Sequence, residues 1–325
     1  MQNKQLVNKF KTGSLNYIRR NGGILIGLLV MCVVISIVSP IFLTERNIMN
    51  VLRQISSNFF LATSMTLVMI SGGIDLSVGS IIAVIGVVGG NLAQSPIPIV
   101  FVILLTLMFG IGFGAVNGFI ISRTTLSPFI VTLAMMSILR GIAYIITKGT
   151  TVRIDNGSYI YLGTGYVFGI PLPVLYMIVI FIAAYILLNR TSLGRHIFAV
   201  GGNARAAIYS GIKTRRVQMF VYIMSGLMSA MAGMVLSARS YSGNPIAGNG
   251  AEMDAIAACA LGGVSLAGGI GSIGGMFLGT LIIGILNNGL NLMGVDSFWQ
   301  TTLKGFIILA AVYIDYLKGL KKISK

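Results

Sequence analysis

The sequence predicts an all-α integral membrane protein, and its composition carries that prediction. Apolar residues (A, V, I, L, M, F, W, Y and C) fill 55% of the 325 positions, only 9% are charged, and the mean hydropathy is +0.91. A soluble domain of this length needs more charge to cover its surface. The apolar runs are continuous rather than alternating, which favours helices over a closed barrel as the way to satisfy the backbone in lipid.

Apolar stretches of roughly 17–25 residues cross a bilayer as helices, and we predict ten spans in a single transmembrane domain that covers residues 1–325. The predicted spans are 24–43, 54–71, 80–94, 98–121, 128–147, 170–188, 216–237, 250–267, 270–293 and 298–317.

The segments between the spans divide into two sides. Residues 189–216 form a loop on the same side as the two tails, 1–22 and 318–325, whereas residues 148–169 and 237–254 form loops on the opposite side. On that opposite side, residues 44–54 are predicted to form a short amphipathic helix. Thr44 is its expected N-cap, and Glu45 in the first turn suits the helix dipole.

The basic residues orient the chain. The formal charge is +16 with 23 Lys and Arg, and most of these lie in the two tails and in residues 189–216. By the positive-inside rule, both termini and this loop are cytoplasmic. Nucleic-acid binding is the other explanation of such a charge, and this distribution disfavours it.

We expect no enzymatic chemistry, cofactor or metal site in this chain. The single histidine, His196, has no second His or Cys to share a metal with, and it lies in the predicted cytoplasmic loop. The sequence contains no Walker-type phosphate loop, and one histidine in such a loop does not build a catalytic triad.

The stretch SGGIDLSVGS places a carboxylate between two apolar runs. Gly72 and Gly73 permit the sharp turn that ends the preceding helix. Asp75 is then suited to cap the next helix by accepting the N–H of Ser77 or Val78. A substrate or proton contact is the alternative role of Asp75, and we favour the cap because the spans hold no complementary set of buried carboxylates or histidines.

A second stretch resembles the first. GGIDLSVG (Gly72–Gly79) is matched by GGVSLAGG, which begins at Gly262 and Gly263 in the other half of the chain. Glycine-broken apolar segments at corresponding positions of two halves point to a transport pathway. Both a diverged duplication and a chance resemblance explain the match, and we favour the duplication.

Four motifs resemble those of a known family. They are GGIDLSVGS, LGRHIFAVGGNARAAIYSGI, AEMDAIAACALGGVSLAGGIG and LNNGLNLMGVDSFWQ, in this order along the chain. They resemble the permease subunits of bacterial ABC importers for ribose, xylose, arabinose and related monosaccharides. The resemblance runs from about Pro40 to the C-terminus. It looks strongest to the ribose permeases, although the same motifs recur throughout the sugar family.

The resemblance implies a subunit of the bacterial inner membrane that translocates a monosaccharide. Such a subunit pairs with a second permease subunit, for which we expect a homodimer. It also pairs with a cytoplasmic ABC ATPase and with an extracytoplasmic sugar-binding protein. Importers for another sugar, a nucleoside or a signalling sugar keep the same architecture. An ion-coupled secondary carrier is the rival class, and it would be expected to show more ionisable residues near the midplane.

Within the cytoplasmic loop, residues 203–211 have the pattern of a short helix. Asn203 is a good N-cap, and Gly211 permits the left-handed conformation after the helix end. A helix this short needs a partner surface. The resemblance implies that it is the helix that couples to the ATPase; a membrane-surface helix is the alternative. The residues assigned to it are Asn203, Ala204, Ala206, Ala207, Ile208 and Gly211, with the three alanines expected to allow close approach.

A path for sugars needs amide and hydroxyl groups and little charge. The polar residues on otherwise apolar helices that are candidates to line it are Asn117, Thr132, Asn287, Asn288 and Asn291. Hydrogen bonds between neighbouring helices use the same residue types in membranes. The sequence leaves both roles open for each of these residues.

Overall fold

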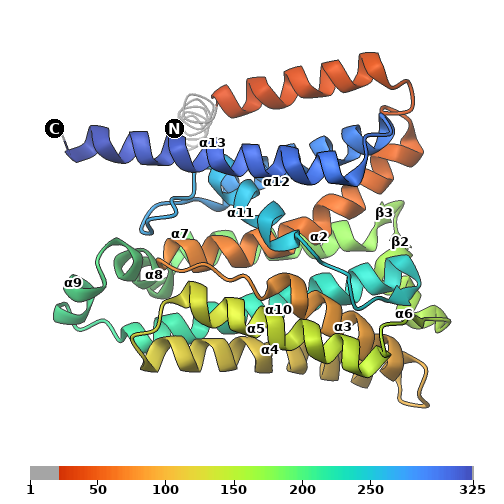
Figure 1. Ribbon diagram of the computed structural model, residues 1–325, viewed down its shortest axis with the longest axis horizontal. Helices are drawn as coiled ribbons and strands as arrows, with labels where there is room; N and C mark the ends of the chain where they lie inside the picture. The colour runs from red at the N-terminus through yellow and green to blue at the C-terminus, as the bar shows by residue number, and fades with distance from the viewer. Residues whose placement is uncertain (1–21, 324–325) are drawn as a thin grey trace, which may run out of the picture.

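The computed structural model describes residues 22–323 and is a bundle whose long helices run in roughly one direction (Figure 1). Helices α8 (Ser192–Gly202) and α9 (Ala204–Tyr209) lie at one end, together with the last described turns of α13 (Ser297–Ile323). Helix α6 (Gly157–Thr164) and strands β2 (Tyr166–Val167) and β3 (Ile170–Pro171) lie at the other. We call these the α9 end and the α6 end.

Helices dominate the described part of the chain. The first is Gly22–Val38. The others not yet named are α2 (Glu45–Ile70), α3 (Val78–Ala93), α4 (Ile99–Arg123), α5 (Pro128–Thr147), α7 (Leu172–Arg190), α10 (Thr214–Ser240), α11 (Ala251–Leu261) and α12 (Ile273–Leu292). Strand β1 (Val152–Arg153) pairs antiparallel with β4 (Ser242–Gly243), and β2 pairs with β3.

Five helices of the described chain are long and apolar enough to cross a membrane: α4, α5, α7, α10 and α12. Helix α5 has the predicted bounds 128–147, and the other four differ from their predicted spans by one to three residues at each end. Gly22–Val38 and α3 are apolar but shorter. The all-α prediction is thus confirmed apart from the two small sheets, while the count of ten spans and the location of the termini stay predictions.

Two predicted boundaries are wrong. The amphipathic helix 44–54 and the span 54–71 are one continuous helix, α2, whose N-cap Thr44 accepts the Asn47 N–H as expected. The span 250–267 contains only the eleven residues of α11. At 1.5 Å per residue α11 covers about 16 Å, half of a bilayer core. Its apolar composition, which suggested a full span, continues into a loop.

The predicted loop 237–254 has other bounds than expected, and part of it packs inside the bundle. Helix α10 extends to Ser240, and the chain then folds back into the bundle before α11 begins. The Arg140 guanidinium of α5 donates to the Pro245 and Ala247 carbonyls at 2.7 and 2.8 Å. A Cβ on Gly79, at the start of α3, would meet the backbone of Gly248. An arginine within a predicted span therefore satisfies carbonyls of a loop that enters the bundle.

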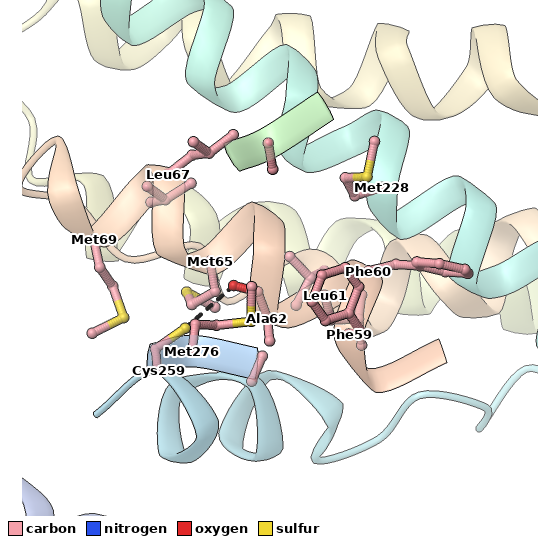
Figure 2. Close-up of a cluster of buried hydrophobic side chains, with 14 of the residues drawn as sticks. Phe59, Phe60, Leu61, Ala62, Met65, Leu67, Met69, Met228, Cys259 and Met276 are labelled. Atoms are coloured by element: carbon pink, nitrogen blue, oxygen red, sulfur yellow. Dashed lines mark hydrogen bonds between the residues drawn. The ribbon is translucent and has the colours of Figure 1, made fainter. Parts of the chain in front are cut away.

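Helix α2 lies at the centre of the core. Its residues 59–70 are all buried. In Figure 2 its apolar side chains lie between Met228 of α10 and the pair Cys259 and Met276 of α11 and α12. The Cys259 thiol donates to the Ala62 carbonyl at 3.3 Å. Because protein rather than lipid surrounds α2, this helix does not need the hydropathy of a lipid-facing span.

Glycines bring α4 and α10 into contact. A Cβ on Gly226 would lie 2.8 Å from the Gly114 amide nitrogen, and one on Gly110 would lie 2.6 Å from the Gly226 carbonyl oxygen. Small residues of this kind let membrane helices approach closely. Gly226 directly follows Ser225, so the contact also fixes the side chain that meets Asp75.

Candidate functional site

The break between α2 and α3 is built around Asp75. Gly72 ends α2 in the left-handed conformation (φ +87°), and the Gly73 N–H donates to the Val68 carbonyl at 3.0 Å. The Asp75 carboxylate is fully buried, and its Oδ1 accepts the Ser77 N–H at 2.9 Å and the Ser77 hydroxyl at 2.6 Å. Its Oδ2 accepts the Ser225 hydroxyl from α10 at 2.6 Å.

The hydrogen bond expected from the Ser77 N–H is present, but the prediction that Asp75 is the N-cap of α3 is wrong. The N-cap is Ser77, two residues later, and Asp75 instead stabilises the loop that leads into the helix. The Ser225 hydroxyl is a partner that the sequence did not reveal, because it lies 150 residues away on another helix. Three donors on one carboxylate meet the demand of a buried charge for hydrogen bonds.

Two of the proposed path residues belong to this break. The Asn117 amide of α4 donates to the Ser77 hydroxyl oxygen at 2.9 Å, and the Thr132 hydroxyl of α5 contacts the Ile74 carbonyl at 3.1 Å. Both side chains are fully buried. Both residues therefore make hydrogen bonds between a helix and the break, which is the alternative to lining a sugar path.

The second break resembles the first, although its left-handed glycine lies two residues before Ser265 and that of the first break lies three residues before Asp75. Helix α11 ends at Gly263 in the left-handed conformation (φ +77°), and the Val264 N–H donates to the Cys259 carbonyl at 2.9 Å. The Ser265 hydroxyl oxygen accepts the N–H of Ala267, two residues later, at 3.3 Å, just as Asp75 accepts the N–H of Ser77. Gly262 instead packs on α12, where its Cβ would lie 2.6 Å from the Met276 Cα. The likeness seen in the sequence thus extends to hydrogen bonding.

A cavity of about 570 Å³ opens beside α2. Its polar lining comes from three helices: Asn47, Asn50, Gln54, Ser57 and Asn58 of α2, Arg239 and Ser240 of α10, and Asn288 and Asn291 of α12. Leu61, Ile82, Gly248 and Ala251 are among its other lining residues. Amide groups therefore dominate the polar chemistry of the cavity, and Asp75 does not line it.

Several of these side chains are already engaged. Asn47 and Asn288 exchange two amide hydrogen bonds of 3.0 and 2.9 Å, and the Arg239 guanidinium donates to Asn50 at 2.7 Å. Within the described residues, Gln54 and Asn58 make no side-chain hydrogen bond, and the buried Ser57 hydroxyl has no partner. These three side chains leave donors and acceptors available to a bound molecule.

The sequence analysis missed the α2 residues of the cavity, although a pattern for them existed. Asn47, Asn50, Gln54 and Asn58 are spaced by three or four residues, which puts them on one face of a helix. The predicted boundary at Gln54 divided these four residues between an outer helix and a span, so their common face was not recognised.

The three asparagines of α12 have different surroundings. Asn288 and Asn291 line the cavity, and Asn288 also makes the helix-to-helix hydrogen bonds with Asn47, so the path role of both stays a prediction. Asn287 instead donates to Asp254 of α11 at 3.1 Å, and the same carboxylate pairs with Lys304 of α13 at 2.9 Å. This mostly buried ion pair attaches α13 to the short helix α11.

The loop at the α9 end has the predicted short helix. The Asn203 side chain accepts the Ala206 N–H at 3.0 Å, and Gly211 adopts the left-handed conformation (φ +79°) after α9. Ile208 and Tyr209 are exposed by 56% and 90%, and Ala204 and Ala206 are exposed as well.

One expectation for this helix is wrong. Ala207 is only 4% exposed and belongs to the hydrophobic core of the chain, so it does not offer a small outer surface for another protein. The preceding helix α8, which we did not predict, buries Ile197 and Val200 against the bundle. The loop is therefore a pair of packed helices with an exposed tip.

Comparison with known proteins assigns the chain to a family. Residues 47–312 match the family described as branched-chain amino acid transport system / permease component. The chain belongs to this permease family. The match covers both helix breaks, the cavity and the α8–α9 loop.

Similar proteins carry sugar-transport names. The permease is 42% identical over 321 residues to the ribose import permease protein RbsC of Bacillus subtilis, covering 98% of this chain and 100% of the relative. It is 43% identical to RbsC of Escherichia coli K12 over 298 residues (90% and 93%). It is also 38% identical to the L-arabinose permease AraH of Azospirillum brasilense over 293 residues (90% and 86%). No solved structure matches the chain.

The Asp75 site yields a prediction on stability. Asp75→Asn keeps the oxygen that accepts from Ser77 and should cost about 1–3 kcal/mol for the changed contact with Ser225, whereas Asp75→Ser has one shorter oxygen and should cost more. Asp75→Leu strands three buried donors, each worth about 1–3 kcal/mol, and should lower the unfolding temperature in detergent markedly. Asp155→Leu, at an exposed carboxylate, is the control. Normal stability with no uptake in Asp75→Asn would show that the charge itself acts in transport, against a purely structural role.

Proposed function

We propose that this permease is the membrane-spanning subunit of an ATP-driven ABC importer that translocates a monosaccharide, namely ribose. The observation that carries the proposal is the 42% identity along nearly the whole chain to a ribose import permease. Xylose and arabinose permeases are similar over shorter alignments or at lower identity, so another pentose is the nearest alternative substrate.

The cavity suits such a substrate. A monosaccharide is neutral and carries hydroxyl groups that both donate and accept, and amide side chains do the same. The available groups of Gln54, Ser57 and Asn58 lie on one wall. The volume of about 570 Å³ falls within the usual range of small-molecule pockets. In this proposal the α6 end faces outward, and the cavity receives the sugar from an extracytoplasmic binding protein.

The α9 end suits a cytoplasmic ATPase. Helix α9 exposes Ile208 and Tyr209 beyond a packed base, and exposed basic residues such as Arg205 and Lys213 surround it. Exposed apolar and aromatic side chains anchor protein interfaces. The proposal therefore has α9 dock onto a separate ATPase chain that hydrolyses ATP. Two permease subunits, each with its own α9, would form a homodimer in the bacterial inner membrane.

Uptake in proteoliposomes tests the function. The permease is reconstituted with an ABC ATPase and a sugar-binding protein from the same organism, and labelled ribose is supplied outside. We expect uptake with ATP and none with a non-hydrolysable analogue, with xylose and arabinose competing weakly. Uptake without ATPase, driven by a proton or sodium gradient, would establish the secondary carrier instead. Preference for a nucleoside would retain the class and replace the substrate.

The cavity amides should contribute to translocation. Gln54→Ala and Asn58→Ala each remove a hydrogen-bonding group worth about 0.5–1.5 kcal/mol, so each should reduce the ribose uptake rate by about 2–10-fold. Asn189→Ala, at an exposed amide on the α9 end of α7, is the matched control. Sugar binding by the isolated binding protein should not change. Wild-type uptake by both cavity variants would exclude this wall from the sugar path.

The exposed tip of α9 should hold the ATPase. The double variant Ile208→Ala and Tyr209→Ala removes the apolar anchors and should weaken ATPase association by roughly tenfold or more. The double variant Tyr144→Ala and Ile145→Ala, at an exposed pair on α5, is the matched control. Co-purification and binding to immobilised ATPase are the measurements. Equal ATPase binding by both doubles would remove α9 from the interface.

A further inference from the structure

Three backbone segments meet at the α9 end without side chains between them. They are the last turn of α8 at Gly201, the end of α2 at Ile70 and Gly72, and the loop after α11 at Gly268 and Gly269. The Gly269 N–H donates to the Ile70 carbonyl at 2.9 Å, so the two helix breaks are joined by a direct hydrogen bond. We call this contact the glycine junction.

Gly201 lies against that hydrogen bond. A Cβ at position 201 would overlap the Ile70 carbonyl oxygen and lie 2.8 Å from the Gly269 nitrogen. A Cβ on Gly268 would in turn lie 2.7 Å from the Gly201 carbonyl oxygen and 3.0 Å from the Gly72 Cα. Gly201 and Gly268 therefore need glycine for steric reasons, whereas Gly72 needs it for its positive φ of +87°, since a Cβ there would lie an ordinary 3.7 Å from the Gly201 Cα.

The junction connects directly to the ATPase-docking helix. Gly201 is followed by Gly202 and then by Asn203, the N-cap of α9. Helix α8 cannot tilt freely, because Ile197 and Val200 are buried against the bundle. Backbone contacts therefore connect the segment before α9 to both breaks, with no flexible side chain between them.

We propose that Gly201 is a positioning residue that transmits movement of α9 to both helix breaks at once. This inference rests on the proposed function, since it assigns α9 to the ATPase. When α9 moves, the contact at Gly201 shifts the Ile70 and Gly269 segments together and alters the hydrogen bond between them. The break at Asp75 and the break at Ser265 then change in concert rather than separately.

The chain offers a matched pair of variants. Gly201→Ala introduces a methyl group into the junction, whereas Gly202→Ala introduces the same group where no atom lies within 4 Å. Both positions end the same helix, and neither requires a positive φ, so the gain in helix propensity is equal. Differences between the two variants therefore report the contact alone.

The experiment uses the complete transporter in proteoliposomes. We measure assembly with the ATPase, basal ATP hydrolysis, the stimulation of hydrolysis by sugar-loaded binding protein, and sugar uptake. For Gly201→Ala we expect normal assembly and basal hydrolysis, with stimulation and uptake reduced by roughly tenfold, since overpacking displaces the contacting segments. Gly202→Ala should match the wild type in all four measurements.

A second variant guards against a folding defect. One glycine inserted after Gly202 lengthens the connection to α9 and leaves the junction itself unchanged. We expect it to assemble and hydrolyse ATP but to lose stimulation and uptake. Normal stimulation and uptake in either test variant, or loss of assembly in both, overturns the proposal. Absence of ATP-dependent sugar uptake in the wild type would instead refute the proposed function, so the two failures are distinguishable.

Discussion

Breaking a helix inside a membrane releases backbone N–H and C=O groups that lipid cannot satisfy, and this constraint explains much of the structure. At the first break, glycine ends α2, and one carboxylate accepts the Ser77 N–H and the hydroxyls of Ser77 and Ser225. At the second break, Ser265 performs the local part of this task without a charge. At these places the backbone leaves the helical path where side chains, from the break itself or from neighbouring helices, provide new hydrogen-bond partners.

The same constraint shapes the interior beside the cavity. The chain before α11 enters the bundle because Arg140 supplies donors for two of its carbonyls. Helix α2 carries a polar stripe at the cavity and an apolar second half in the core. Charge and amide groups occur where other protein segments or an aqueous cavity receive them, which follows from their high cost in lipid. The cavity and the breaks therefore both follow from the need of polar groups for hydrogen-bond partners away from lipid.

Close backbone contacts link these features along the bundle. Glycines between α4 and α10 bring Ser225 within reach of Asp75, and glycines at the α9 end bring the two breaks together. In a membrane protein such contacts contribute through packing, since lipid is as apolar as the side chains. The glycines thus allow close backbone contacts, and one added methyl group would force the contacting segments apart. The sugar path and the ATPase-docking loop of our proposal lie at opposite ends of this connected frame.

The sequence by itself determined the class of the protein, most of the helices, both glycine breaks and the short helix capped by Asn203. These properties depend on composition, on hydropathy over one segment, or on residues within a few positions of one another. The tertiary structure alone decided that Ser225 meets Asp75, that Asn287 leaves the cavity wall, and that Ala207 faces inward. It also decided that α11 spans half the distance its hydropathy suggested. Each of these outcomes depends on contacts between segments far apart in the chain, and a polar or small residue on a helix has the same local pattern whichever neighbour it meets.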